Sequence, residues 1–349
     1  MGRSVTMRTV AEKAGVSMKT VSNVINGTGS FSEETGRRVR TAVEELGYRI
    51  NPFARGLRSR RTGTIALLIP NVYQPFNAEL AEQIIRAPET RGLKVVVETT
   101  RGDARREQAL LTTSPGELVD GIIYVPHALS AEQYLALPVA QPMVVVSERP
   151  AEADGLNLDY VEIADEQGSH AAVTHLLAQG RRRVAAIFEP AGPRAGGRRL
   201  HGYRRALAEA GVDYDDSLVA HVDNADLWSS GVGAATRLLR TRARFDALFC
   251  YNDVVAIGAL SVLQRSGVAV PDDVALAGFD DIEAARFTTP PLTTVDPRRR
   301  SIARTAVELL RARTDAADSR ALPGRTRTAG FELLVRQSSG AGPEADAGE

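Results

Sequence analysis

The chain has 349 residues, of which 43% are hydrophobic and 25% charged, and its formal net charge is zero. This length suits two or three domains with real cores. The sequence contains no apolar run of the roughly 18 to 20 residues that a membrane span needs and no apolar N-terminal signal, so we expect a cytoplasmic protein with no membrane partner. The single cysteine, Cys250, excludes an internal disulfide, and its apolar neighbours favour a buried, inert thiol.

The zero net charge conceals an uneven distribution along the chain. Residues 1–61 contain 12 lysines and arginines and five acids, which gives this segment a charge of +7 and leaves −7 for the remainder. A basic segment attached to an acidic body is typical of a polyanion-binding module joined to a domain that does not bind polyanions.

The first 26 residues predict a helix-turn-helix. Apolar residues recur at helical spacing on both sides of Gly15, namely Val10, Ala11 and Ala14 before it and Val21, Val24 and Ile25 after it. Thr6 and Ser17 are suitable N-caps for the two helices, and Gly15 permits the sharp turn between them. In such a motif the second helix enters the major groove of DNA, whereas an ordinary helical hairpin is the alternative.

A third helix is expected to begin at the cap residue Ser32 and to end at Gly47. Residues 51–61 follow, in which Pro52 suits the first position of a short helix. Gly56 and the dense arginines make that helix unstable alone, so a flexible basic linker is the alternative in the absence of DNA.

Beyond residue 64, short apolar runs alternate with helical stretches. The expected strands are 65–69, 94–97, 121–125, 143–146, 184–188, 217–221, 247–251 and 274–277. The expected helices are 76–91, 104–113, 165–179, 198–211, 229–241, 253–266 and 298–312, with Pro88 kinking or ending the first at residue 87. This alternation predicts an α/β fold with two successive sets of parallel strands, whose ligand binds beyond the carboxyl ends of the strands.

Motifs distributed over nearly the whole chain, to about residue 338, carry a family resemblance. In the basic segment they are Val10-Ala-Glu-Lys-Ala-Gly-Val-Ser17, Thr20-Val-Ser22, Val24-Ile-Asn26 and Asn51-x-x-Ala-Arg-x-Leu57. In the remainder they include Pro75-Phe-Asn-Ala-Glu-Leu80, Arg199-x-x-Gly-Tyr203, Asn252-Asp-Val-Val-Ala-Ile-Gly258, Gly278-Phe-Asp-Asp281 and Pro291-Leu-Thr-Thr-Val295. Together they resemble the lactose/galactose/purine-repressor (LacI/GalR) family of bacterial transcriptional regulators.

The resemblance implies a helix-turn-helix headpiece and a two-lobed, periplasmic-binding-protein-like core of parallel sheets flanked by helices. The implied divisions are a headpiece over 1–50, a hinge helix or linker over 51–62, and an effector-binding and dimerisation core over 63–339. Its N-lobe would comprise about 63–161 and 292–322, and its C-lobe about 162–291 and 323–339. The last residues, 340–349, have the composition of a disordered tail.

The resemblance also implies a homodimer bound to a near-palindromic, double-stranded DNA operator. Met18, Lys19 and Asn23 would read base edges, since lysine can donate to guanine and asparagine can pair with adenine. Thr6, Ser17, Thr20, Ser22 and Asn26 would hold phosphates or cap helices, which positions the protein without specifying sequence. In the hinge the implied residues are Ala54, Arg55 and Leu57, of which Leu57 matches the leucine that inserts between base pairs in the minor groove.

The implied effector site draws on strand-end residues of both lobes. They are Phe76, Asn77, Glu148, Arg149, Arg199, Asp226, Asn252 and Asp280. An aromatic ring can pack on a sugar or a base, and the polar groups can hold hydroxyls or ring nitrogens. Alternatively, Asn252 caps a helix, Asp280 serves a turn and Arg199 is a surface charge.

Two departures from the family pattern predict an atypical pocket. Glu148 stands where an aspartate is common, and Asp226 stands where many members have an aromatic residue. We expect a small-molecule effector, with a sugar as the first choice and a purine-type co-repressor as the alternative.

No catalytic or metal-binding constellation is visible in the sequence. The five histidines lack H-E-x-x-H or Cys/His spacing, no serine lies in G-x-S-x-G, and Gly192–Gly197 lacks the ending of a Walker A motif. We therefore expect neither enzymatic activity nor a metal or cofactor. A solute-binding protein is disfavoured by the basic segment, and an architectural DNA binder without an effector is disfavoured by the polar residues at the strand ends.

Overall fold

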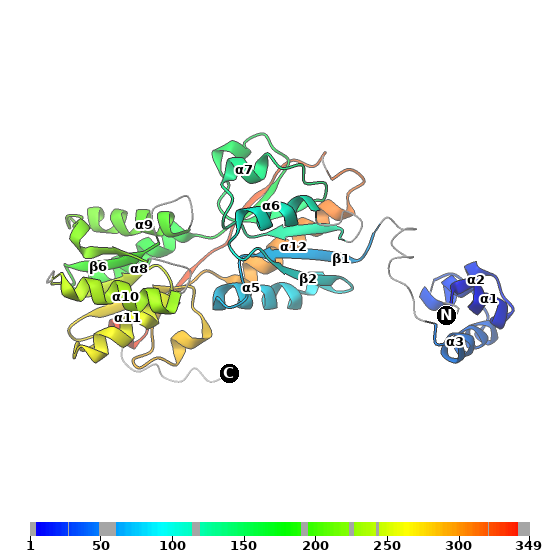
Figure 1. Cartoon of the computed structure of the whole chain (residues 1–349), viewed down its shortest axis with the longest axis horizontal. Helices are drawn as coiled ribbons and strands as arrows, with labels where there is room; N and C mark the ends of the chain where they lie inside the picture. The colour runs from blue at the N-terminus through cyan, green and yellow to red at the C-terminus, as the bar shows by residue number, and fades with distance from the viewer. Residues whose placement is uncertain are drawn as a thin grey trace. The chain divides into compact units, whose positions relative to one another are not determined.

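The computed structural model describes residues 5–26, 28–48, 61–113, 119–189, 195–222, 227–241, 244–319 and 321–340. The chain divides into two compact units, which we call the headpiece (Met1–Thr62) and the body (Gly63–Glu349) (Figure 1). None of the helices within the described ranges combines the length and the apolar character that crossing a bilayer requires.

The described residues of the headpiece form three helices, α1 (Met7–Ala14), α2 (Met18–Asn26) and α3 (Glu33–Leu46). Thr6 caps α1 as predicted: its hydroxyl accepts a hydrogen bond from the Thr9 amide at 3.3 Å. Gly15 follows α1 with φ of 64°, a left-handed conformation that permits the sharp turn into α2. Seven residues of the three helices form the buried core, namely Val10, Ala11, Ala14, Val21, Val24, Val39 and Ala42.

The body contains two six-stranded sheets, each flanked by helices, which confirms the predicted α/β class. The strands are β1 (Thr64–Ile69), β2 (Lys94–Thr99), β3 (Gly121–Tyr124), β4 (Met143–Val146), β5 (Asp159–Glu162), β6 (Val184–Phe188), β7 (Val219–His221), β8 (Ala247–Cys250), β9 (Ala275–Phe279), β10 (Thr293–Asp296), β11 (Thr326–Thr328) and β12 (Glu332–Leu334). The longer helices are α5 (Pro75–Arg86), α6 (Ala104–Thr113), α7 (Ala131–Leu135), α8 (Asp165–Ala178), α9 (Ala195–Glu209), α10 (Leu227–Arg240), α11 (Asp253–Arg265) and α12 (Arg299–Asp315). The 3-10 helices are η1 (Pro88–Thr90), η2 (Ala151–Ala153), η3 (Asp216–Leu218), η4 (Glu283–Arg286) and η5 (Gln337–Ser339).

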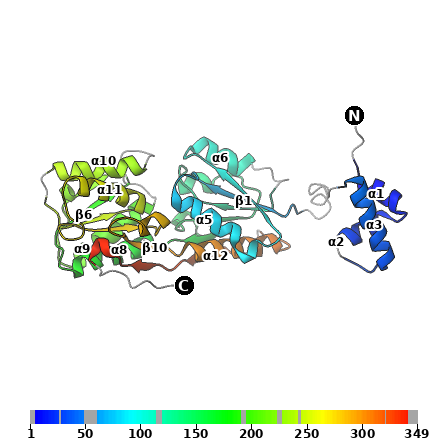
Figure 2. The same ribbon diagram turned by 90° about the horizontal axis from the view of Figure 1, so that it is seen from below.

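The strand order defines two lobes. The N-lobe sheet runs β11-β5-β4-β3-β1-β2 and is parallel throughout, whereas the C-lobe sheet runs β12-β10-β9-β8-β6-β7 and is parallel except where β12 meets β10. Both faces of each sheet are covered by helices, which explains why the strands β1, β3, β4, β6, β8 and β9 are almost continuously apolar (Figure 2). Alternate residues of β1 show this: Ile65 and Leu67 pack into the cluster shared with α5 and α12, whereas Leu68 packs into the cluster beneath α6 and α7.

The chain passes between the lobes three times. The crossings follow β5, β10 and β11, because β10 still pairs within the C-lobe sheet and β11 still pairs within the N-lobe sheet. The second and third crossings therefore lie later than the expected boundaries at 291/292 and 322/323. The physical reason is that each crossing segment first contributes a short strand to the lobe that it leaves, and these strands were not among those predicted.

A buried ionic cluster ties the third crossing to the N-lobe. Asp159, which is fully buried on β5, accepts hydrogen bonds from Arg313 on α12 at 2.8 Å and from Arg325 before β11 at 2.6 Å. Burial raises the pKa of Asp159, but its hydrogen bonds to the two arginines outweigh burial and hold that pKa below its usual value. The cluster thus anchors β11 beside β5.

The end of helix α5 and the start of strand β7 have clear local causes. Pro88 ends α5 as predicted: α5 stops at Arg86, and the 3-10 helix η1 begins at Pro88. The predicted strand 217–221 is shorter in the structure because Asp215 accepts hydrogen bonds from the amide and the hydroxyl of Ser217, which turns residues 216–218 into η3.

Candidate functional site

The exposed start of α2 carries residues that the sequence predicts to contact DNA. Ser17, Met18 and Lys19 are exposed, and Met18 is 53% accessible despite its apolar side chain. The Ser17 hydroxyl caps α2 by accepting from the Thr20 amide at 3.1 Å. Lys19 forms no ion pair with any residue that the structure describes, so its ammonium group is available to a polyanion. Helix starts of this kind present backbone amides that suit phosphate groups.

The remaining predicted DNA-binding residues differ in what the structure shows. Ser22 and Asn23 are half-buried along α2, and the turn after the helix approaches Asn23 so closely that a Cβ on Gly29 would lie 2.8 Å from its amide nitrogen. Thr6 uses its hydroxyl to cap α1. The side chain of Asn26 and the hinge residues Ala54, Arg55 and Leu57 lie outside the described residues.

Contacts from α3 hold α1 and α2 in their relative positions. Arg38 on α3 donates to the carbonyl oxygens of Ala14 and Gly15, the residues at the turn between α1 and α2. The ammonium of Lys13 lies 2.6 Å from the Glu45 carboxylate, which links α1 to α3 as well. These contacts hold α2 at a fixed angle to α1 and α3.

In the C-lobe, the structure brings together Arg199 and Asp280, and Arg199 also contacts the backbone of Tyr251, the residue before Asn252. Asn252 and Asp280 follow the carboxyl ends of β8 and β9, and Arg199 lies on α9. Arg199 is only 4% accessible, which rules out a simple surface charge; it donates to the Asp165 carboxylate at 2.8 Å, to Asp280 at 3.2 Å and to the carbonyl of Tyr251. Asn252 also caps α11, since its side-chain oxygen accepts from the Val255 amide at 2.9 Å.

Asp280 has a strained backbone and an altered acidity. Its φ of 108° is rare for a residue with a Cβ, and such conformations typically cost about 1 to 3 kcal/mol and cluster at functional sites. Burial raises the pKa of Asp280 to about 6, although the positive charges of Arg199 and Arg299 oppose the increase. Burial lowers the pKa of Arg199, but the charges of Asp165 and Asp280 outweigh it and raise that pKa above its usual value.

Two sets of polar contacts join the lobes beside this cluster. In the first, Arg198 of α9 lies 3.2 Å from the Glu148 carboxylate of the N-lobe and 2.7 Å from Asp165. The long side chain of Glu148 thus reaches the opposite lobe.

In the second set, Glu79 of α5 pairs with Arg299 at 3.0 Å and accepts from the Glu283 amide at 3.2 Å. Arg299 also donates to the backbone carbonyl of Asp281 at 2.7 Å. Arg299 begins α12 directly after a crossing, so this pair lies where the C-lobe sheet leads back into the N-lobe.

The predicted N-lobe residues have varied surroundings. Phe76 and Asn77 lie in the first turn of α5, with Phe76 half-buried against the N-lobe core and Asn77 buried. Arg149 is engaged within its own lobe, where it donates to the Ala153 carbonyl at 2.6 Å and lies 5.6 Å from the centre of the Tyr160 ring. Asp226 lies outside the described residues.

Sequence reasoning did not select several charged or polar residues of this region. They are Glu79, Asp165, Glu189, Arg198, Tyr251 and Arg299. Glu189 and Tyr251 directly follow β6 and β8, so their position after a buried strand was a usable signal. The pairing of Asp165 with Arg198 and Arg199 depends on how α8 packs on α9 and had no local signal.

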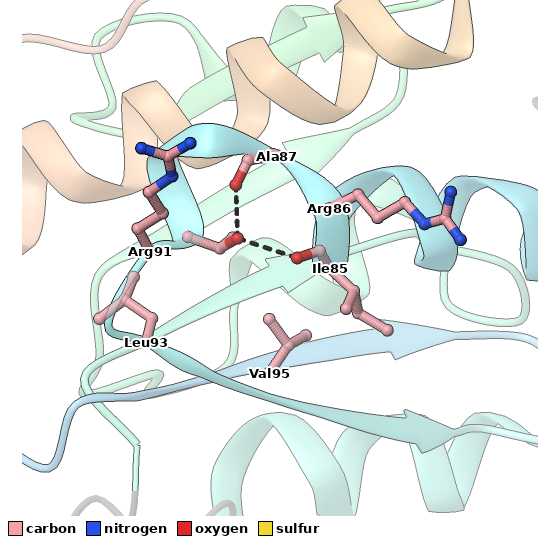
Figure 3. A pocket seen from close by; sticks show the side chains of 7 residues that line it. Ile85, Arg86, Ala87, Arg91, Leu93 and Val95 are labelled. Atoms are coloured by element: carbon pink, nitrogen blue, oxygen red, sulfur yellow. Dashed lines mark hydrogen bonds between the residues drawn. The ribbon is translucent and has the colours of Figure 1, made fainter.

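A pocket of about 300 Å³ lies elsewhere in the N-lobe, where α5 ends and β2 begins (Figure 3). Its lining residues are Ile85, Arg86, Ala87, Thr90, Arg91, Leu93 and Val95. The Thr90 hydroxyl donates to the carbonyls of Ala87 at 2.6 Å and Ile85 at 3.0 Å. Because the pocket lies at the start of a strand, it is separate from the predicted effector residues at the strand ends.

A basic helix-turn-helix headpiece and a two-lobed body with a polar cluster at its strand ends define a DNA-binding regulator with a binding-protein-like body. Comparisons agree: residues 6–51 match the family described as bacterial regulatory proteins, lacI family, and residues 173–339 match the periplasmic binding protein-like domain. The chain is 36% identical to the HTH-type transcriptional regulator CelR of Thermobifida fusca over 88% of this chain and 91% of the relative. It is 32% identical to the HTH-type transcriptional repressor PurR of Aliivibrio salmonicida over 87% and 91%, respectively.

A solved structure described as a transcriptional regulator CelR–cellobiose complex matches with a TM-score of 0.69 and 33% identity, over 96% of this chain and 99% of that chain. The chain therefore belongs to the LacI family of bacterial regulatory proteins, as its motifs indicated. Members of this family are transcriptional regulators and not enzymes.

Proposed function

We propose that the chain is a cytoplasmic, homodimeric transcriptional repressor whose affinity for a near-palindromic operator is set by a sugar bound between the two lobes. The observation that carries the effector part is the buried cluster of Arg199, Asp165 and Asp280 at the strand ends of the C-lobe. Carboxylates and a guanidinium held in fixed positions can discriminate between ligands by their hydroxyl pattern. The relative solved with cellobiose supports a sugar, and the relative named PurR makes a purine the alternative.

Residues of the headpiece would have two different roles in DNA binding. We infer that Lys19, Met18 and Asn23 contact base edges and that Ser17, Thr20 and their neighbours hold phosphates. The exposed start of α2 and its fixing by α3 support this inference. Residues 51–62 would form the hinge, with Ala54, Arg55 and Leu57 in the minor groove.

The two cross-lobe contacts support a mechanism of coupling. The Glu148–Arg198 pair and the hydrogen bond from the Glu283 amide to Glu79 join the lobes, and Glu148 and Glu79 lie on segments that carry predicted effector residues. A ligand that changes the distance or twist between the lobes must rearrange these contacts, and the movement is transmitted to residue 63, where the body begins after the hinge. Such coupling free energies are typically about 1 to 3 kcal/mol.

We infer that α5 forms part of the dimer face, as in the family that the motifs resemble, together with the edge strand β2. The edge position of β2 and the 48% exposure of Ile85 on α5 support this location. The end of α5 before Pro88 shapes this face, since η1 and the pocket of Figure 3 replace the last turn that a longer helix would supply.

Selection of bound fragments from the source genome tests the DNA-binding part. We expect the full-length protein to enrich a near-palindrome that a variant lacking residues 1–61 does not enrich. Lys19→Ala should relax base preference at one symmetric position per half-site. A uniform loss of affinity across all sequences would instead make Lys19 a phosphate contact, and equal enrichment by the truncated variant would contradict the headpiece assignment.

A further inference from the structure

The hydroxyl group of Tyr251 is buried without a hydrogen-bond partner among the described residues. Tyr251 is 3% accessible and immediately follows β8, in the middle of the C-lobe sheet. Its backbone carbonyl accepts from Arg199, so the residue belongs to the same strand-end region as the Arg199–Asp280 pair. A buried hydroxyl that lacks a partner is destabilising, so its presence calls for an explanation, and a ligand that completes its hydrogen bonding is one.

Glu189 occupies the neighbouring strand end. It follows β6, which pairs with β8, and the Tyr251 amide donates to the carbonyl of Ile187 at 2.9 Å, which brings the two strand ends side by side. Burial raises the pKa of the Tyr251 hydroxyl, and the negative charge of Glu189 and weak hydrogen bonding to its carboxylate, outside ordinary hydrogen-bond geometry, raise it further, while the charge of Arg199 opposes the increase. The Glu189 carboxylate and the Tyr251 hydroxyl are therefore close enough to interact electrostatically.

A glycine at the start of α9 makes room for Glu189. A Cβ on Gly196 would lie 2.9 Å from the Cβ of Glu189 and 3.0 Å from its carboxylate, so only a glycine lets the helix approach this side chain without displacement. The close approach confines the carboxylate beside the strand ends.

Arg198 and Arg199 of α9 are paired with other carboxylates, and the charge of Glu189 is only a smaller contribution to the raised pKa of Arg199. Arg199 is shared between Asp165 and Asp280, and Arg198 is shared between Asp165 and Glu148. Glu189 forms no ion pair with any described residue. A free carboxylate beside a phenolic hydroxyl accepts from one ligand hydroxyl while the phenol donates to another, but the carboxylate repels a phosphate or a second carboxylate.

We propose that Glu189 and Tyr251 form a specificity pair that accepts a neutral polyhydroxyl ligand and rejects phosphorylated or carboxylated ones. The Glu189 carboxylate accepts a hydrogen bond from a sugar hydroxyl, and the Tyr251 hydroxyl donates to an adjacent sugar oxygen. This inference rests on the proposed sugar effector and adds the charge class of that sugar.

The test uses the full-length protein and a panel of cellobiose, glucose, glucose 6-phosphate, gluconate and hypoxanthine, first by thermal shift and then by calorimetry. The variants are Glu189→Gln and Tyr251→Phe. The matched controls are Glu209→Gln at the far end of α9 and Tyr214→Phe, which lies beyond that end.

We expect a neutral sugar to bind and both variants to weaken it at least about tenfold, while the controls leave its affinity unchanged. Glu189→Gln should also reduce discrimination against the anionic analogue. The ligand-free melting temperature of Tyr251→Phe should not fall, because the variant removes a buried hydroxyl without a partner. A merely structural tyrosine would lower the melting temperature instead.

The outcomes separate this inference from the proposed function. If a neutral sugar binds the wild type and both variants equally well, the specificity pair is refuted and the sugar effector stands. If only an anionic compound or hypoxanthine binds, or if no compound binds, both the sugar effector and the pair are refuted.

Discussion

Asp280 should make the stability of the C-lobe depend on pH. Burial raises its pKa in the folded protein to about 6, compared with the usual 3.8. A carboxyl group with a raised folded-state pKa stabilises the fold when protonated, so this contribution is complete below pH 3.8 and is lost as the pH rises through 6. Between pH 7 and pH 5 the linkage relation gives a gain of about 1 kcal/mol, and the full gain at low pH is about 3 kcal/mol.

Urea unfolding at pH 7, 6 and 5 measures this contribution. Trp228 on α10, the single tryptophan of the chain, reports C-lobe unfolding by fluorescence. The difference in unfolding free energy between wild type and Asp280→Asn should grow by about 1 kcal/mol from pH 7 to pH 5 in favour of the wild type. Asp213→Asn, at an exposed site of the same lobe, should show no such growth. Parallel pH profiles for wild type and Asp280→Asn would refute the predicted linkage.

Three further substitutions test separate features. Gly202→Ala should destabilise the C-lobe by about 1 to 3 kcal/mol in urea, because the new Cβ would lie 2.2 Å from the Glu166 carbonyl oxygen; Gly233→Ala, with no atom closer than 3.6 Å, should be neutral or slightly stabilising. Asp159→Asn should cost about 3 to 5 kcal/mol by the same assay, since it leaves two arginines without their shared buried anion, and a loss below about 1 kcal/mol would contradict this. Leu57→Ala should weaken operator binding at matched salt and leave sugar binding intact, and an unchanged operator affinity would exclude the wedge role.

The elements that the sequence predicted well depend on local patterns. Strands β4 and β6 match the expected 143–146 and 184–188 because continuous apolar runs bounded by polar residues mark strands buried on both faces. Gly15 and Gly47 end their helices as expected, because each adopts the left-handed conformation that glycine reaches without strain.

The short strands β10, β11 and β12 were not predicted because three or four residues carry too little periodicity. Their role comes from tertiary pairing: β11 is held beside β5 by the Asp159 cluster, and β12 is antiparallel to β10. The expected lobe boundaries shifted for this reason.

The residues of the candidate effector site likewise fall into two groups: those that the sequence predicted and those whose proximity depends on the tertiary structure. Arg199, Asn252 and Asp280 were identified because they belong to motifs that carry the family resemblance; Asn252 and Asp280 follow strands, whereas Arg199 lies on α9. Glu189 and Tyr251 became neighbours only through the order of β6 and β8 in the sheet, which a single sequence does not specify. The contact of Glu148 with Arg198 likewise depends on the placement of two lobes.

Operator binding and sugar binding should be coupled through the body, and this coupling is the central claim. The most direct test measures operator affinity by fluorescence anisotropy at zero and saturating sugar, and sugar affinity by calorimetry with and without the selected operator fragment. We expect both affinities to change by the same factor, roughly 5- to 150-fold, because coupling between two sites is reciprocal. Identical operator affinity with and without a sugar that demonstrably binds the body would contradict the claim.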